Sequence, residues 1–133
     1  MKIQDVPFCF SDWSQIKPSE HPGKTGMALW RTLEIGNIRV RMVEYSPGYL
    51  ADHWCNRGHV LLVLEGELVT ELIDGRVFTL TPGTSYQVAD DVANGILIIG
   101  HNFQHQGHKG TRRIFMNWSF LHFLPKRLCS FDE

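Results

Sequence analysis

The stretch "PGYLADHWCNRGHVLLVLEG", residues 47–66, decides the fold and carries the most distinctive chemistry of the chain. It places His53, Cys55 and His59 close together in the sequence. Residues i and i+2 of a strand point to the same face, so His53 and Cys55 are predicted to project together. A turn at 56–58 then brings His59 back beside them. Imidazole and thiolate suit zinc, iron, nickel or cobalt, so the pattern predicts a metal site. The alternative is that Cys55 is a small core residue and the histidines are turn residues.

Short strands with turn signals between them fill the chain from residue 28 to residue 100. Apolar and polar residues alternate on both sides of Gly36-Asn37, a two-residue turn with glycine first that predicts a β-hairpin. No alternation of strands with helices is present before residue 92. The sequence therefore predicts an all-β sandwich or barrel. The strands expected after the hairpin are 59–64, 67–73, 76–80, 84–90 and 95–100.

Length, charge and cysteine content narrow the class of protein. A chain of 133 residues is enough for one domain with a real core. A net charge of −1 gives no reason to expect a nucleic-acid or anionic-membrane partner. The longest apolar run, Val60–Leu64, is too short to span a membrane, and the first residues lack the apolar core of a signal peptide. Three cysteines at no disulfide-framework spacing predict a reducing, cytoplasmic location.

The quoted stretch resembles the first sequence motif of the cupin superfamily. In that motif a glycine precedes His-x-His, a glutamate follows after three or four residues, and a second glycine comes six residues later. Here Gly48 and Gly66 stand at the glycines, His53-Trp54-Cys55 stands at His-x-His, and His59 stands at the glutamate. Gly48 is one residue nearer the first histidine than usual. Cys55 and His59 replace two of the usual ligands, and both replacements can bind a metal.

Residues 52–55 also resemble a small group of cupins with a motif of Asp, His, Cys and Trp. The resemblance covers roughly residues 10–92 and implies a cupin-type jelly-roll barrel (a double-stranded β-helix) whose ligands face the interior. It also implies a divalent transition metal such as zinc, iron or nickel, a small-molecule ligand inside the barrel, and a homodimer. The expected segments are an irregular arm over 1–27, the barrel over 28–100, and a tail over 101–133 that is atypical and lies outside the barrel.

The second cupin motif is incomplete. Gly75 and Thr81-Pro82-Gly83 match its framework, but the histidine ligand expected near Asp91 is absent, and the next histidine is His101. In one explanation the tail folds back and supplies His101 or His105 as the fourth ligand.

In the other explanation the native C-terminal part is missing through truncation or a shifted reading frame, and the protein is an inactive cupin. Residues 92–133 carry 2 acids, 5 bases and four of the seven histidines, a change of texture that this explanation would produce. The run 112–124 is compatible with a helix, but its amphipathic pattern is poor, so the tail is expected to be irregular or helical.

Four further residues are predicted to contact a small molecule: Arg41, Tyr45, Trp54 and Tyr86. The alternative for each is packing in the core or at its rim.

The first function hypothesis is a metal-binding cupin with ligands His53, Cys55, His59 and His101 and with oxygenase or isomerase chemistry. The second is a metal-free domain that binds or senses a small ligand or sugar, so whether the protein is an enzyme stays open.

Overall fold

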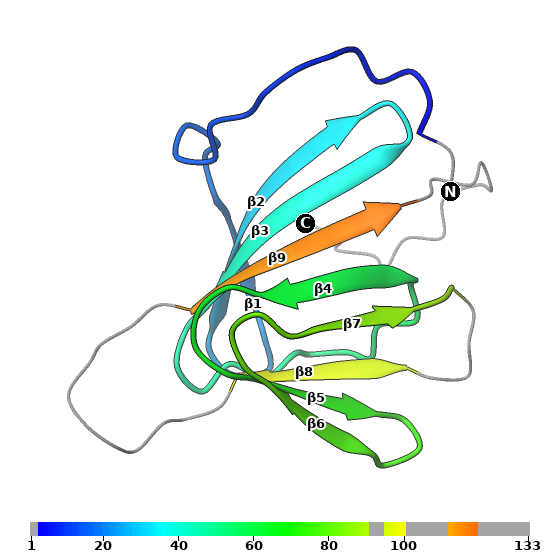
Figure 1. Ribbon diagram of the computed structural model, residues 1–133. Helices are drawn as coiled ribbons and strands as arrows, with labels where there is room; N and C mark the ends of the chain where they lie inside the picture. The colour runs from blue at the N-terminus through cyan, green and yellow to red at the C-terminus, as the bar shows by residue number, and fades with distance from the viewer. Residues whose placement is uncertain (1–2, 91–94, 101–111, 120–133) are drawn as a thin grey trace.

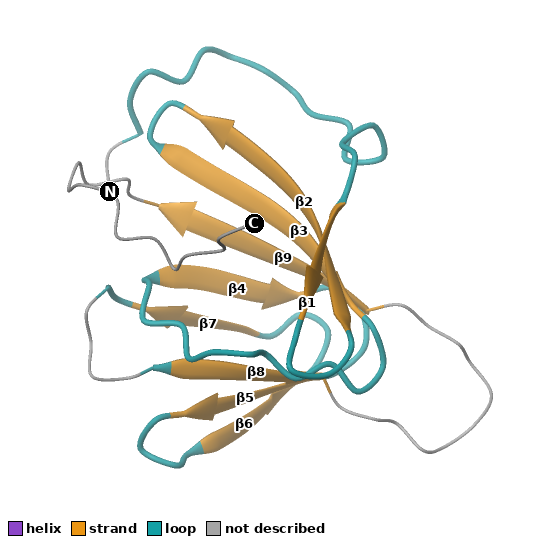
Figure 2. Ribbon diagram, turned by 180° about the vertical axis from the view of Figure 1, so that it is seen from behind, coloured by secondary structure: helices purple, strands orange, loops and turns teal. Residues whose placement is uncertain are grey.

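Two antiparallel β-sheets face each other in this protein (Figures 1 and 2). The computed structural model describes residues 3–90 and 95–100, and the backbone of residues 112–119. Its strands are β1 (Ser19–Pro22), β2 (Met27–Ile35), β3 (Ile38–Tyr45), β4 (His59–Val63), β5 (Leu68–Leu72), β6 (Val77–Leu80), β7 (Ser85–Val88), β8 (Ile96–Gly100) and β9 (Arg112–Ser119). The described residues include no helix, and so none with the length and apolar character that a membrane span requires.

The larger sheet has the strand order β1-β2-β3-β9-β4-β7, and the smaller sheet has the order β6-β5-β8. The chain from Tyr49 to Cys55 runs beside β8 and pairs with it at Leu50↔Ile99 and Cys55↔Ile96. This segment therefore widens the smaller sheet. A bridge between Leu50 and Thr25 also links it to the residues just before β2 of the larger sheet. The all-β jelly-roll barrel is confirmed.

The β2–β3 hairpin closes at the predicted turn. Ile35 pairs with Ile38, and Gly36 lies between them with φ of 54°. Side chains with a Cβ rarely adopt this conformation, and a Cβ at Gly36 would also lie 2.3 Å from the carbonyl oxygen of Gln4. Glycine is thus required both by the turn and by the arm that passes over it.

Part of the tail is a strand rather than a helix or an irregular segment. The backbone of β9 pairs with β3 on one side and with β4 on the other, so that Met116 lies between Arg41 and Leu61. Without β9, β3 and β4 would each present a row of unpaired N–H and C=O groups. Backbone pairing thus outweighs the weak helical pattern of 112–124. Strand β1 likewise falls within the segment expected as an irregular arm and pairs with β2.

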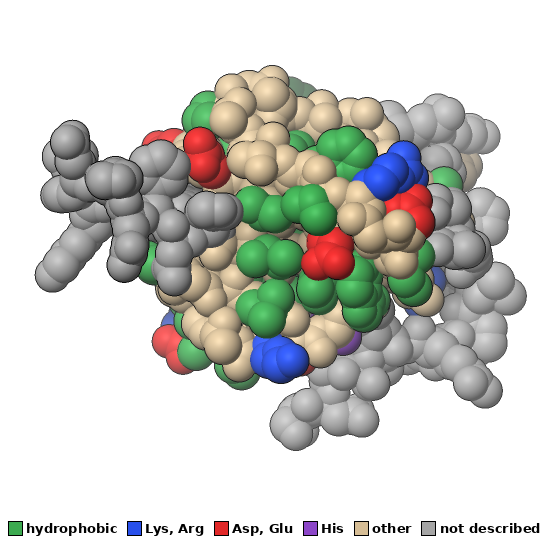
Figure 3. Space-filling model, turned by 90° about the horizontal axis from the view of Figure 1, so that it is seen from below, with side chains coloured by type: hydrophobic (Ala, Val, Ile, Leu, Met, Phe, Trp, Pro, Cys, Tyr) green, Lys and Arg blue, Asp and Glu red, His purple; other side chains and the backbone are tan. Residues whose placement is uncertain are grey.

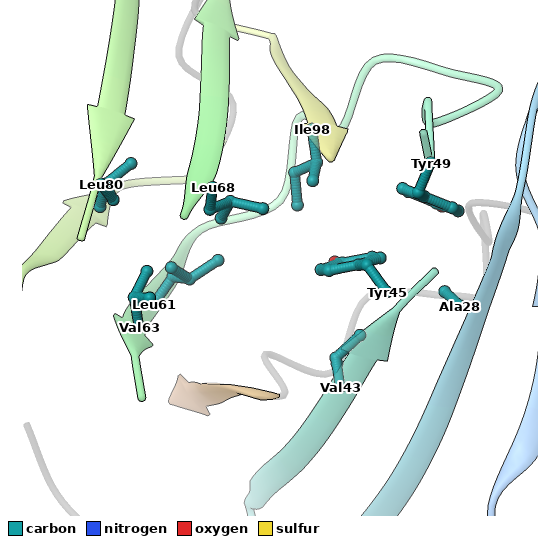
Figure 4. Close-up of a cluster of buried hydrophobic side chains, with 9 residues drawn as sticks. All are labelled: Ala28, Val43, Tyr45, Tyr49, Leu61, Val63, Leu68, Leu80 and Ile98. Carbon is teal, nitrogen blue, oxygen red and sulfur yellow. The ribbon is translucent and has the colours of Figure 1, made fainter. Parts of the chain in front are cut away.

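The core lies between the two sheets (Figure 4). Leu61 and Val63 of β4 face Leu68 of β5, and all three are fully buried. Full burial of such a side chain stabilises the fold by about 1.5–3 kcal/mol. The cluster consists of Ala28, Val43, Tyr45, Tyr49, Leu61, Val63, Leu68, Leu80 and Ile98.

Some apolar side chains remain on the outside. Hydrophobic residues gather on the face seen from below, where the smaller sheet lies (Figure 3). Ile73, which follows β5, and Val77 and Phe78 of β6 are 57%, 58% and 48% exposed. The residues whose pKa values burial shifts most strongly, Arg41, Tyr45 and Tyr86, lie in the interior, which is therefore the candidate location of a functional site.

Candidate functional site

The register of the larger sheet gathers polar side chains on its inner face. Val43 and Leu61 point into the core, so Arg41 shares the inner face with Val43 on β3, and His59 shares it with Leu61 on β4. Tyr86 of β7 pairs with Leu61 and packs against the core. Met116 joins Arg41 to Leu61 through the backbone, which places Arg41, Leu61 and Tyr86 in one row across the sheet.

His59 is held in one orientation by two hydrogen bonds. Its Nδ1 lies 2.8 Å from the carbonyl oxygen of Arg57, and its Nε2 lies 2.8 Å from the hydroxyl of Tyr86. A carbonyl oxygen can only accept, so Nδ1 carries the proton and the neutral ring accepts the Tyr86 proton at Nε2. Burial lowers the pKa of His59, which favours this neutral form at neutral pH. The pair places a hydroxyl donor and an imidazole base in contact inside the barrel.

The three tyrosines of the chain all lie in or against the core. Burial raises the pKa of Tyr45 and of Tyr86 well above the ordinary value, and it raises the pKa of Tyr49 to about 12. The rings of Tyr45 and Tyr49 pack with their centres 4.6 Å apart. The tyrosines therefore keep their protons at neutral pH and present hydroxyl groups to the interior.

Cys55 also belongs to the inner surface. It pairs with Ile96, whose side chain is buried on the inner face of β8. After burial, an ionised Cys55 contributes to raising the pKa of Tyr45 and of Tyr86, and it opposes the effect of burial at Arg41. The thiol is therefore within electrostatic range of these three side chains.

His53 and Cys55 do not share a face, because the strand between them is interrupted. The backbone N–H of Ala51 bonds to Ile98, and that of Cys55 bonds to Ile96. From Ala51 to Cys55 this segment advances by four residues, whereas its partner β8 advances by only two, from Ile98 to Ile96. The extra residues therefore bulge out of the ladder. The prediction of a shared face assumed a regular strand, which this bulge breaks.

The bulge carries His53 and Trp54 towards the surface. The His53 side chain is 43% exposed, and its Nδ1 lies 2.6 Å from a carboxylate oxygen of Asp52. Trp54 is 41% exposed and covers Gly95, where an added Cβ would lie 3.3 Å from the Cβ of Trp54. The structure thus brings together Arg41, Tyr45, Tyr86, Cys55 and His59, and it places His53 and Trp54 apart from them.

The predicted metal ligands do not form a complete site in this arrangement. Across 3–90 and 95–100, no three side chains of His, Cys, Asp or Glu are placed to hold one metal ion. Both ring nitrogens of His59 already have hydrogen-bond partners, and His53 lies on the bulge. His101 and His105 fall outside the described residues. The described donors therefore do not fit a metal unless His59 leaves Tyr86 and further ligands join it.

One inner polar residue was not predicted. Thr70 of β5 is 2% exposed, and in the described part of the chain its hydroxyl has no hydrogen-bond partner. It alternates with Leu68, which lies in the core. The sequence offered a signal for it, because Thr70 stands two residues after Leu68 and so on the same face of the strand. A buried hydroxyl without a partner is costly, so this position favours a bound polar group or water.

Comparison with known proteins supports the fold. No protein-family model and no curated protein matches the sequence. Among solved structures, ectoine synthase from P. lautus matches with a TM-score of 0.63 and 15% identity over 84% of this chain and 78% of that one. An RmlC-like cupin from Shewanella frigidimarina matches with a TM-score of 0.59 and 18% identity over 87% and 94%. The chain has the cupin fold.

A third cupin-fold structure, described as a sugar phosphate isomerase from Silicibacter pomeroyi, has a TM-score of 0.60 and 17% identity over 80% of this chain and 72% of that one. At these identities the likeness supports the cupin fold and not a shared activity. Membership of the Asp, His, Cys and Trp motif group stays a prediction.

Proposed function

We propose that this cupin-fold domain binds a small polar molecule inside the barrel, in contact with Arg41, Tyr45 and Tyr86. The observation that carries the proposal is the convergence of polar side chains from separate strands onto one inner surface beside the apolar core. Sites of this kind combine an apolar lining with a few placed polar groups. The buried hydroxyl of Thr70, on the facing sheet, adds a group that a polar ligand would satisfy.

Isomerisation by proton transfer is the chemistry that this surface serves best, because Tyr86 and His59 form a donor and acceptor pair. In this proposal Tyr86 touches the ligand, and His59 holds the Tyr86 hydroxyl in place. The cytoplasmic location, the homodimer and the absence of a nucleic-acid or membrane partner stay predictions.

Small polar fragments are expected to bind near Tyr86, and a screen followed by two-dimensional amide NMR tests this. Bound fragments should shift the amide signals of β3, β4 and β7 and leave the turn at Asp74-Gly75 unchanged. Tyr86→Phe should weaken binding up to about tenfold, because one neutral hydrogen bond contributes about 0.5–1.5 kcal/mol. Tyr49→Phe, which removes the hydroxyl of another buried tyrosine, should bind as the unmodified protein does. Shifts confined to the outer strand surfaces would contradict the proposal.

A transition metal is the second candidate, favoured by one observation. Tyr86 is hydrogen-bonded to His59 and lies within electrostatic range of Cys55, and in the described part of the chain these two residues bring a nitrogen and a sulfur donor to the inner surface. A bound metal would supply a Lewis acid or a redox centre. His59 and Cys55 would hold it, and the sequence predicts His53 and His101 as further ligands, of which His53 would have to move inward from the bulge.

The metal candidate predicts that cobalt(II) added to the chelator-treated protein gives a thiolate-to-metal charge-transfer band. Cys55→Ser should remove the band, because the serine hydroxyl is a poor ligand for such ions. Cys9→Ser changes an exposed cysteine and is the control. His53→Ala and His101→Ala should each weaken cobalt binding at least tenfold. A protein that gives no such band with cobalt(II) would remove the metal candidate and leave the metal-free site.

A further inference from the structure

Arg41 is held in place by two residues of the neighbouring strand β2, Trp30 and Thr32. The central carbon of its guanidinium lies 4.1 Å from the centre of the Trp30 ring, and its Nε donates to the hydroxyl of Thr32 over 3.2 Å. The ring of His21 also stacks on Trp30, with the ring centres 3.7 Å apart. Stacking and the Thr32 bond fix the plane of the guanidinium, so a ligand that binds it meets a pre-organised group.

Positive charge is in excess on this part of the inner face. The inward positions of β2 and β3 next to Arg41 hold a second arginine, Arg39, and one carboxylate, Glu34. Glu34 forms an ion pair with Arg39. Burial, and after it the charge of Arg39, lowers the pKa of Arg41 to about 10. Negative charge brought to this position would offset both effects.

The chemistry of a guanidinium selects the kind of group that it binds. The Nε–H of Arg41 donates to Thr32, and a guanidinium presents its N–H donors in a planar fork. That fork matches the two oxygens of a carboxylate or of a phosphate and binds them through paired hydrogen bonds. An ammonium group in the same place lacks this geometry.

We propose that the small molecule bound in the barrel carries a carboxylate or phosphate group and that Arg41 binds this oxyanion beside the Trp30 ring. The inference rests on the proposed interior site and adds the class of ligand. The rest of the molecule would extend from Arg41 over Leu61 towards Tyr86, along the row that the register defines.

Matched pairs of compounds test the inference on the full chain. Butyrate is compared with butyramide, and glycerol 3-phosphate with glycerol, by following the indole N–H signal of Trp30 in NMR titrations. The carboxylate or the phosphate is expected to bind at least tenfold more tightly than its neutral partner, and the stronger anion identifies which oxyanion the site takes. Arg41→Gln should remove this preference, and Arg41→Lys should reduce binding about tenfold through loss of the paired hydrogen bonds.

Arg76→Gln is the control, because Arg76 is an exposed arginine paired with Asp74 on the β5–β6 turn. It should bind both anions as the unmodified protein does. Thermal unfolding of each variant shows whether it is folded. Equal binding of charged and neutral partners, or a preference that survives in folded Arg41→Gln, would overturn the inference while the interior site stands. Titrations in which no compound affects the inner strands would overturn the proposed function as well.

Discussion

A proline at position 116 is expected to prevent this chain from folding. Met116 lies in the middle of β9, whose backbone pairs with β3 on one side and with β4 on the other. Proline has no N–H to donate, so it removes a ladder hydrogen bond and is essentially excluded from strands that are paired on both sides. A domain of this size is stable by only about 5–15 kcal/mol. Circular dichroism and thermal unfolding of Met116→Pro should therefore show loss of the cooperative transition.

Val77→Pro is the matched control for position 116. Val77 is the first residue of β6, an edge strand of the smaller sheet, and its side chain is 58% exposed. Proline is tolerated at the start of an edge strand, so this variant should keep a cooperative transition close to that of the unmodified protein. Equal melting of the two variants would mean that β9 adds nothing to the sheet. The truncated or frame-shifted alternative would then gain support.

The fold could be predicted because local signals specify most of its strands. The turn at Gly36-Asn37 and the positive φ angles of Gly75 (87°) and Gly83 (84°) lie where turn residues interrupt the alternating pattern. The position of β9 could not be predicted in the same way. It depends on pairing with β3 and β4, which are distant in sequence, and the local pattern of 112–119 does not specify those partners.

The site could be predicted in part, for a related reason. His59 faces inward because it alternates with Leu61, and period-two alternation is visible in the sequence. His53 was expected beside Cys55 on the same rule, but the bulge between Ala51 and Cys55 breaks the alternation. A bulge of this kind is fixed by the partner strand, so a single-strand pattern does not reveal it.

Alkaline solution is expected to unfold the protein and to ionise its three tyrosines in a single step. Tyr45 and Tyr49 are 3% and 6% exposed, and Tyr86 lies against the same core. Burial raises the pKa of each one above the ordinary value of about 10. Above pH 10 the unfolded chain therefore loses tyrosine protons that the folded chain retains.

The sign follows from proton linkage, in which stability falls with rising pH wherever the unfolded state binds fewer protons. Each buried tyrosine lowers the free energy of unfolding by about 1.4 kcal/mol per pH unit. This loss begins near pH 10 and continues to about pH 12 for Tyr49. Arg41, with its pKa lowered to about 10, acts in the opposite direction and offsets about one tyrosine. The net loss is therefore about 3 kcal/mol per pH unit.

Tyrosinate absorbance and circular dichroism, followed together from pH 8 to pH 12.5, measure this effect. The rise in absorbance should coincide with the loss of β-sheet signal, whereas in guanidinium chloride the tyrosines should titrate near pH 10, because there they are exposed. Tyr86→Phe should lower the absorbance step by one third and make the loss of stability less steep. Tyrosinate that appears gradually near pH 10 while the sheet signal is intact would mean that water reaches these hydroxyls in the folded state. In that case the interior surface that contains Tyr86 and His59 would be open to solvent, and a ligand could reach it without any opening of the barrel.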